Sequence, residues 1–345
     1  MATNPAMAGM AVARWLLVCC AMVFAMIMVG GVTRLTHSGL SIVEWQPIIG
    51  TLPPLSIEQW NETFQKYQQT PEYRLVNHSM ALDEFKGIFW WEYFHRLLGR
   101  LIGAVFLLPL IYFASTRRIE HRMVPRLAII FILGGMQGAL GWYMVKSGLV
   151  DDPRVSQYRL TAHLGMAFLI YGAMLWTALD LLWGSRAENM APAPASMRIR
   201  RYAHSISALI FLMILSGGFV AGIRAGLAYN TFPLMNGSWV PPEIFLLDPW
   251  YLNFFSNMAT VQFDHRLLAW LLAVLVPGFW WMTRNAGIAP RTRTLIVLLN
   301  CMLAVQIALG ISTLLLMVPV PLAAAHQAGA VLLFSLALAV SHDVP

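Results

Sequence analysis

The sequence EYFHRLLGRLIG, residues 92–103, recurs as QFDHRLLAWLLA, residues 262–273. A second stretch, TAHLGMAFL (161–169), matches AAHQAGAVL (324–332), and MQGALGW (136–142) matches VQIALGI (305–311). Each copy carries a pair of histidines, His95 with His163 and His265 with His326. The chain is therefore predicted to be a tandem repeat that contains two paired-histidine sites.

The composition indicates a membrane protein. The chain has 345 residues, of which 58% are hydrophobic and 11% charged, and its mean hydropathy is +0.63, which excludes an ordinary soluble domain. A bilayer-spanning helix needs roughly 20 mostly apolar residues. By this criterion we predict an all-α integral membrane protein with eight transmembrane helices, at residues 15–36, 88–114, 125–147, 158–183, 201–225, 259–283, 293–316 and 322–342.

The distribution of charge predicts the orientation. If the N-terminus is cytoplasmic, that side carries 12 of the 23 Lys and Arg residues but only four of the 16 acidic residues. Basic residues in short loops favour the cytoplasmic side, so we expect both termini there. The net charge of +7 then reflects topology, and we expect no nucleic-acid partner. Because no Arg- and Ser-rich transit segment precedes the first span, we expect a bacterial inner membrane.

The repeat divides the chain into two four-helix bundles. GGVTRLTHSGL (30–40) corresponds to GGFVAGIRAGL (217–227), and a segment rich in Pro, Ala and charge lies between the copies. We predict an N-terminal bundle at 1–184, a cytoplasmic linker at 185–200 and a C-terminal bundle at 201–345. Four spans per copy give both bundles the same orientation, which is a parallel repeat about an axis along the membrane normal.

The four histidines suit a haem. All lie within about eight residues of the outer end of an even-numbered span, roughly 10 Å inside the membrane. Ionisable residues at such depth are costly and usually mark function, although a single one is often a hydrogen-bonded core residue. Two imidazoles with no nearby Cys or third His do not complete a zinc site. They do complete a haem, whose other four ligands come from the porphyrin.

Four arginines lie near these histidines. Arg96 and Arg266 follow two of them directly, and Arg34 and Arg224 end the first and fifth spans. Arginine forms bidentate pairs with carboxylates, so we predict that the four bind haem propionates. The alternative is that they simply extend to the interface.

The copies differ at one chemically important position. Glu92 precedes His95 by three residues, whereas Gln262 precedes His265. A carboxyl group in an apolar site can transfer protons, and an amide cannot. We therefore place the chemistry in the N-terminal half, with Glu92, His95 and His163 as catalytic residues, and an electron-transfer centre in the C-terminal half. The alternative is that Glu92 only orients an arginine.

Taken together, the motifs resemble the haem A synthase family. They are GGVTRLTHSGLS, WQPIIGTLPP, EYFHRLLGR, GALGWYMVKSGL, AHLG and AHQAG, and the match covers nearly the whole chain. The resemblance implies oxidation of the C8 methyl of haem O to a formyl group through an alcohol, giving haem A for cytochrome oxidases. It also implies haem b on His265 and His326, and substrate haem O on His95 and His163 with Glu92. Some family members have a cysteine pair in the first outer loop, which this sequence lacks.

Two other functions are compatible with the pattern. A di-haem b cytochrome would pass electrons from a quinol without altering haem, and a haem or solute transporter would use the duplicated topology. Because a free hydrophobic haem is hazardous, we expect an association with haem O synthase, and the chemistry requires an electron donor that the sequence does not identify. The sequence does not determine the oligomeric state, and it is compatible with a homo-oligomer.

Overall fold

The computed structural model describes residues 5–44, 49–148, 155–184 and 194–344. The Trp-Gln-Pro element at 45–47 and most of the predicted linker lie outside these ranges. Within them the chain is helical, without β-strands, and eight helices are long and apolar enough to cross a membrane, which confirms the predicted fold class. They are α1 (Pro5–Leu35), α4 (Leu82–Ser115), α5 (Val124–Gly148), α6 (Gln157–Trp183), α7 (Pro194–Gly222), α9 (Met258–Thr283), α10 (Pro290–Leu315) and α11 (Val320–Asp343).

All eight helices begin earlier than predicted, and α1, α4 and α7 do so by six residues or more, with α1 beginning at Pro5 rather than residue 15. Helix α4 begins at Leu82 rather than residue 88, and its first turn carries Asp83 and Glu84, whose charges interact favourably with the helix dipole. Helix α7 begins at Pro194, so the last residues assigned to the linker are helical. A criterion based on apolar composition detects only the membrane-buried part of a helix, so it misses the residues by which the helix extends beyond the membrane.

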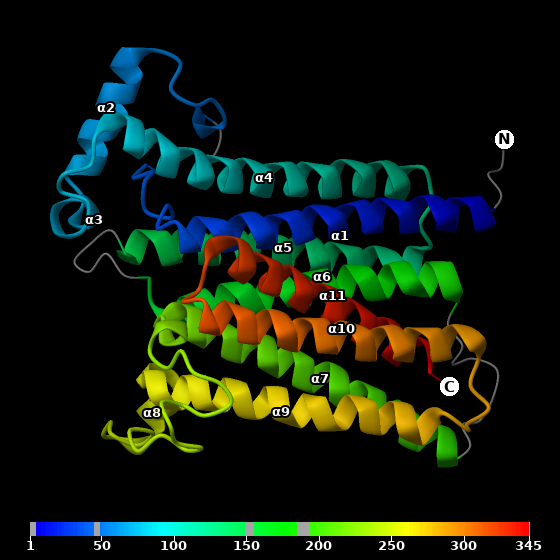
Figure 1. The fold of residues 1–345 in the computed structure, drawn as a ribbon. Coiled ribbons are helices and arrows are strands. Elements are labelled where there is room, and N and C mark those ends of the chain that lie inside the picture. The colour runs from blue at the N-terminus through cyan, green and yellow to red at the C-terminus, as the bar shows by residue number, and fades with distance from the viewer. Residues whose placement is uncertain (1–4, 45–48, 149–154, 185–193, 345) are drawn as a thin grey trace.

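The two halves pack in the same way. Helix α1 contacts α4 and α6, and α5 contacts both α4 and α6; in the second half α7 contacts α9 and α11, and α10 contacts the same two helices. The halves meet where α1 contacts α11, α6 contacts α7, and α6 contacts α11. Helices α1, α6, α7 and α11 therefore form the centre of the molecule, with α4, α5, α9 and α10 outside them (Figure 1).

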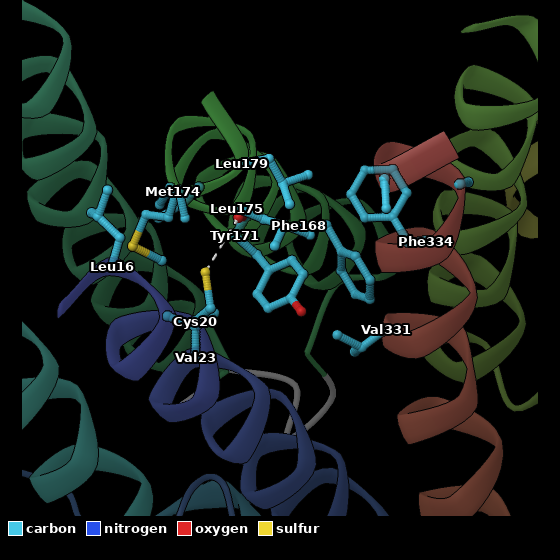
Figure 2. Packing of buried hydrophobic residues seen from close by; sticks show 14 of the residues in the cluster. Leu16, Cys20, Val23, Phe168, Tyr171, Met174, Leu175, Leu179, Val331 and Phe334 are labelled. Carbon is cyan, nitrogen blue, oxygen red and sulfur yellow. Dashed lines mark hydrogen bonds between the residues drawn. The ribbon is translucent and has the colours of Figure 1, made fainter. Parts of the chain in front are cut away.

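The main core lies in this centre. Figure 2 shows Cys20 of α1, Phe168 and Tyr171 of α6 and Phe334 of α11 packed together across the boundary between the halves. The hydroxyl groups of Tyr171 and Ser335 are 2.8 Å apart, which adds a polar contact between α6 and α11. The extensive apolar contact indicates that the halves form one folded unit.

The two ends of the helices differ. Helices α1 and α11 place both termini at one end, which we call the terminal end (Figure 1). The opposite end, the loop end, carries the short helices α2 (Ile57–Gln68), α3 (Pro71–Leu75) and α8 (Asn253–Ser256). Helix α2 is the longest of the three. Its aromatic face packs on α4, where Tyr67, Phe85, Phe89 and Tyr93 form a separate buried cluster.

Glu72 of α3 is buried beneath this cluster. Its side chain accepts a hydrogen bond from the Tyr67 hydroxyl at 3.4 Å, and the Asn77 amide donates to the same hydroxyl at 2.7 Å. Burial, reinforced by the negative charge of Glu92, raises the pKa of Glu72 to about 7. The folded protein therefore holds a proton on Glu72 that the unfolded chain releases near pH 4.5.

We expect the stability of the loop end to fall as pH rises. Between about pH 4.5 and about pH 7 the folded state binds more protons than the unfolded state at Glu72, so stability decreases with pH and levels off above pH 7. Glu72→Gln should remove this dependence and raise the apparent Tm at pH 8 by a few degrees, at about 2–4 °C per kcal/mol. The measurement is thermal unfolding in detergent at pH 5 and pH 8, with exposed Glu58→Gln as the control. An unchanged pH profile in Glu72→Gln would contradict the assignment.

Candidate functional site

The first histidine of each half packs against a glycine of the first helix of that half. A Cβ added to Gly30 of α1 would lie 3.1 Å from Nε2 of His95 on α4. A Cβ added to Gly217 of α7 would lie 3.4 Å from Cε1 of His265 on α9. Gly30 and Gly217 are the first glycines of the matched GG pairs. Absence of a side chain there lets each imidazole lie directly against the neighbouring helix.

The second histidine of each half has the same arrangement. A Cβ on Gly141 of α5 would lie 2.9 Å from Cε1 of His163, and one on Gly310 of α10 would lie 2.9 Å from Cε1 of His326. One turn earlier on the same two helices lies a glutamine. Gln137 Nε2 donates to the carbonyl of His163 at 3.0 Å, and Gln306 Nε2 donates to that of His326 at 2.9 Å. The matched MQGALGW and VQIALGI stretches thus hold the histidine helix and leave room for its ring.

The second glycine of each GG pair faces the other half. A Cβ on Gly31 of α1 would overlap the side chain of Gln327 on α11, and one on Gly218 of α7 would overlap Thr161 of α6. Gln327 also donates to the carbonyl of Ile27 at 2.9 Å. Each GG pair therefore serves two purposes, because one glycine makes room for a histidine and the next allows the halves to approach closely.

His95 and His163 are close enough to interact electrostatically, as are His265 and His326. All four rings are partly accessible, while the Nδ1 atoms of His163 and His326 are buried without a hydrogen-bond partner among the described residues. In the same residues no three His, Cys, Asp or Glu side chains converge to hold a bare metal ion. Two imidazoles per half therefore fit a haem, which requires only two axial ligands from the protein.

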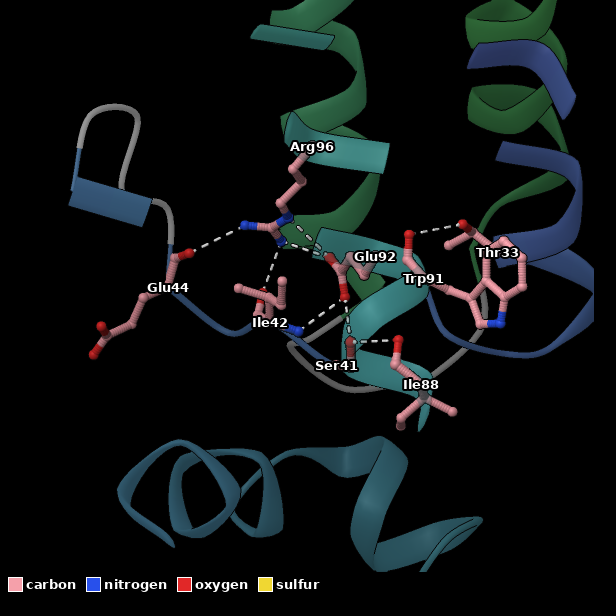
Figure 3. A network of polar contacts seen from close by, with 8 residues as sticks. All are labelled: Thr33, Ser41, Ile42, Glu44, Ile88, Trp91, Glu92 and Arg96. Atoms are coloured by element: carbon pink, nitrogen blue, oxygen red, sulfur yellow. Dashed lines mark hydrogen bonds and ion pairs between the residues drawn. The ribbon is translucent and has the colours of Figure 1, made fainter. Parts of the chain in front are cut away.

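Glu92 lies in a polar network that attaches the chain after α1 to α4 (Figure 3). Its side chain is only 3% exposed. Oε1 pairs with Arg96 Nη2 at 2.6 Å, and Oε2 accepts from the Ser41 hydroxyl and the Ile42 amide, each at 2.8 Å. Arg96 also donates to the carbonyls of Ile42 and Glu44. Glu92 thus holds the loop that follows α1 and orients Arg96, and its catalytic role stays a prediction.

The second half has a neutral version of this network. Gln262 accepts from Arg266 Nη2 at 3.0 Å and donates to the carbonyl of Ala225 at 2.8 Å. Arg266 also donates to the carbonyls of Tyr229, Pro233 and Leu234. Arg96 and Arg266 therefore hold equivalent loop backbones, and their predicted binding of propionates stays a prediction.

Arg34 and Arg224 join the two halves at the loop end. Arg34 Nη2 donates to the carbonyl of Ala221 at 3.1 Å, and Arg224 Nη2 donates to Nδ1 of His37 at 3.2 Å. In the matched 30–40 and 217–227 segments, position 34 corresponds to 221 and position 37 to 224. Each of these two contacts therefore joins residues at equivalent positions of the two repeat copies. Partial burial and the guanidinium groups of Arg224 and Arg34 lower the pKa of His37, so the neutral imidazole accepts this bond.

Several residues around the site were not predicted. They are the four glycines, Ser41 and Ser216, whose hydroxyl lies 3.2 Å from Nδ1 of His265. The glycines were visible in the matched stretches, but their role depends on which helix lies opposite. Ser41 carried no distinguishing pattern, and the role of Ser216, like that of the glycines, depends on which helix lies opposite.

The fold defines a polytopic helical membrane protein whose two halves carry equivalently placed pairs of histidines. The sequence model of the cytochrome oxidase assembly protein family COX15-CtaA matches residues 13–338, and the chain belongs to that family. It is 62% identical over 334 residues to the Heme A synthase of Nitrosospira multiformis, covering 96% of this chain and 93% of that protein. It is 46% identical to Heme A synthase COX15 of Bos taurus, covering 95% of this chain and 80% of that protein. The predicted family is thus confirmed.

We expect Gly141→Ala to displace His163. A Cβ only 2.9 Å from the imidazole forces the ring or the helix to shift, which should lower the haem held in the N-terminal half by roughly tenfold. Gly138→Ala is the matched control, because an added Cβ there meets no atom within 4 Å. The measurement is haem per chain by solvent extraction and mass spectrometry. Equal haem content in the two variants would refute the steric role of Gly141.

Proposed function

We propose that this chain is a haem A synthase, which oxidises the C8 methyl of haem O to a formyl group through an alcohol. The observation that carries the proposal is the pair of equivalent histidine sites within a chain of this family. His95 and His163 would hold the substrate haem, and His265 and His326 would hold haem b. When bound, haem b would supply one-electron transfer to or from the N-terminal site.

The difference between the halves supports this division. The histidines, glycines and glutamines correspond in both halves, whereas a carboxylate stands beside the first histidine only in the N-terminal half. A centre that only transfers electrons needs no acid or base, whereas oxidation of a methyl group releases protons. Glu92 would therefore accept or donate protons near the substrate, through exchange of its present partners Ser41 and Ile42.

The loop end supports the predicted orientation. All four histidines lie in the halves of their helices nearest the loop end, and Arg34, Arg96, Arg224 and Arg266 lie beyond or beside them. The short connections at the terminal end contain Arg117, Arg118, Arg122 and Arg284, which favours a cytoplasmic location for that end. The loop end would then lie at the outer face of a bacterial inner membrane, where the four arginines would bind haem propionates.

The substrate and product require partners. Haem O and haem A are too hydrophobic to cross water freely, so direct transfer from haem O synthase would protect them. An electron donor or acceptor would act on the haem b half from outside the chain. The two bundles, at 1–184 and 201–345, would divide these tasks between substrate exchange and electron transfer.

We expect substitution of the first histidine of each half to remove a different haem. His265→Ala should lose most of its haem b while keeping haem O or haem A, and His95→Ala should show the opposite pattern, because one of two axial ligands is removed in each case. The measurement is chromatography and mass spectrometry of haems extracted from the purified proteins. Wild-type protein that contains two haem b groups per chain and no haem O or A would instead support the di-haem cytochrome.

Glu92→Gln should reduce haem A formation by roughly 100-fold, since proton transfer by a side chain contributes factors of this size. Ser41→Ala removes one partner of the same carboxylate and keeps the charge, so its effect should stay within about fivefold, the worth of one hydrogen bond of about 1 kcal/mol. The ratio of haem A to haem O in each variant gives the comparison. Equal losses in the two variants would mean that Glu92 acts only by holding the loop.

A further inference from the structure

The first helices of the two halves match closely around the GG pair and differ there at one polar position. VFAMIMVGG (23–31) corresponds to IFLMILSGG (210–218), so Val29 in the N-terminal half stands where Ser216 stands in the C-terminal half. Both residues directly precede the glycine against which the first histidine packs. The substitution therefore gives the C-terminal half a hydroxyl group at a position where the N-terminal half has an apolar side chain.

The two histidines differ accordingly. Ser216 Oγ lies 3.2 Å from Nδ1 of His265, which fixes the orientation of that ring on α9. His95 makes no side-chain hydrogen bond within the described residues, and its Nε2 faces Gly30 of α1. The second histidines are held in similar ways, by Gln137 with Gly141 and by Gln306 with Gly310, and Gln137 Nε2 also lies 3.4 Å from Nε2 of His163. Among the described residues, a hydroxyl group thus lies beside the first histidine of the C-terminal half only.

The chemistry of imidazole gives this contact a consequence. A neutral histidine carries one proton, and an oxygen that accepts from Nδ1–H keeps the proton there and leaves the Nε2 lone pair free for iron. Such a partner also holds the ring plane and increases the basicity of the ligand, and its loss typically costs 10–100-fold in metal affinity. Valine offers none of these effects, so His95 can turn without losing a hydrogen bond.

We propose that Ser216 is a positioning residue that makes His265 a permanent haem ligand, and that Val29 leaves His95 free to release its haem. This inference rests on the proposed function, in which one half keeps a cofactor while the other exchanges substrate for product. A single-residue difference between repeat copies thereby separates the retained haem from the exchanged haem.

The test uses exchange of the two residues. Ser216→Val gives the C-terminal half the residue of the N-terminal half, Val29→Ser does the reverse, and Ser216→Thr keeps the hydroxyl. Each full-length protein is purified in detergent with its haems, and transfer of each haem to apomyoglobin is followed by absorbance and mass spectrometry. The low-spin electron paramagnetic resonance signal of the haem b centre is recorded as a second readout.

We expect Ser216→Val to release haem b roughly tenfold or more faster than the wild type and to shift its low-spin signal. Ser216→Thr should remain near the wild type, and Val29→Ser should slow release of the N-terminal haem. Wild-type release of haem b and an unchanged signal in folded Ser216→Val would overturn the positioning role. Wild-type release from Val29→Ser would overturn the exchange role. Haem identity in the wild type tests the proposed function separately, because a di-haem b protein could still show the Ser216 effect.

Discussion

Close contact between glycine and imidazole is the constraint on which the rest of the structure depends. Gly30, Gly141, Gly217 and Gly310 each leave the space that a histidine ring occupies, and in two cases an added Cβ would lie 2.9 Å from it. Such close contact between backbone and ring restricts how the helices can be placed, most tightly at Gly141 and Gly310. The adjacent glycine of each GG pair extends the constraint to the other half, so the histidine sites and the boundary between the halves are fixed by the same turns of α1 and α7.

A second level of organisation lies at the loop end. In each half two side chains one helical turn apart hold the backbone that follows the first helix. They are Glu92 and Arg96 in the N-terminal half, and Gln262 and Arg266 in the C-terminal half. The ionic pair is nearly buried, and removing one member of such a pair is strongly destabilising, by about 3–5 kcal/mol. The N-terminal half therefore combines structural and chemical demands in one carboxylate, whereas the neutral pair of the C-terminal half meets only the structural demand.

Duplication followed by small differences explains how one fold can hold two haems for different purposes. The second histidines, their glycines and their glutamines are the same in both halves. The differences beside the first histidines include Glu92 against Gln262, Phe94 against Asp264 and Val29 against Ser216. Contacts between Arg34 and Ala221, and between His37 and Arg224, join equivalent positions across the boundary, so the loop ends of the halves are held together.

The sequence by itself determined the fold class, the eight spans and the four histidines, because apolar runs of membrane length and a duplicated motif need no tertiary information. It also indicated that Glu92 was the chemical difference between the halves. Only the tertiary structure decided that Glu92 and Arg96 hold residues 41–44, that each GG pair faces a histidine and the other half, and that Ser216 reaches His265. These contacts depend on which helix faces lie opposite one another, and the apolar spans, being hydrophobic on nearly every face, carry no periodicity that reveals it.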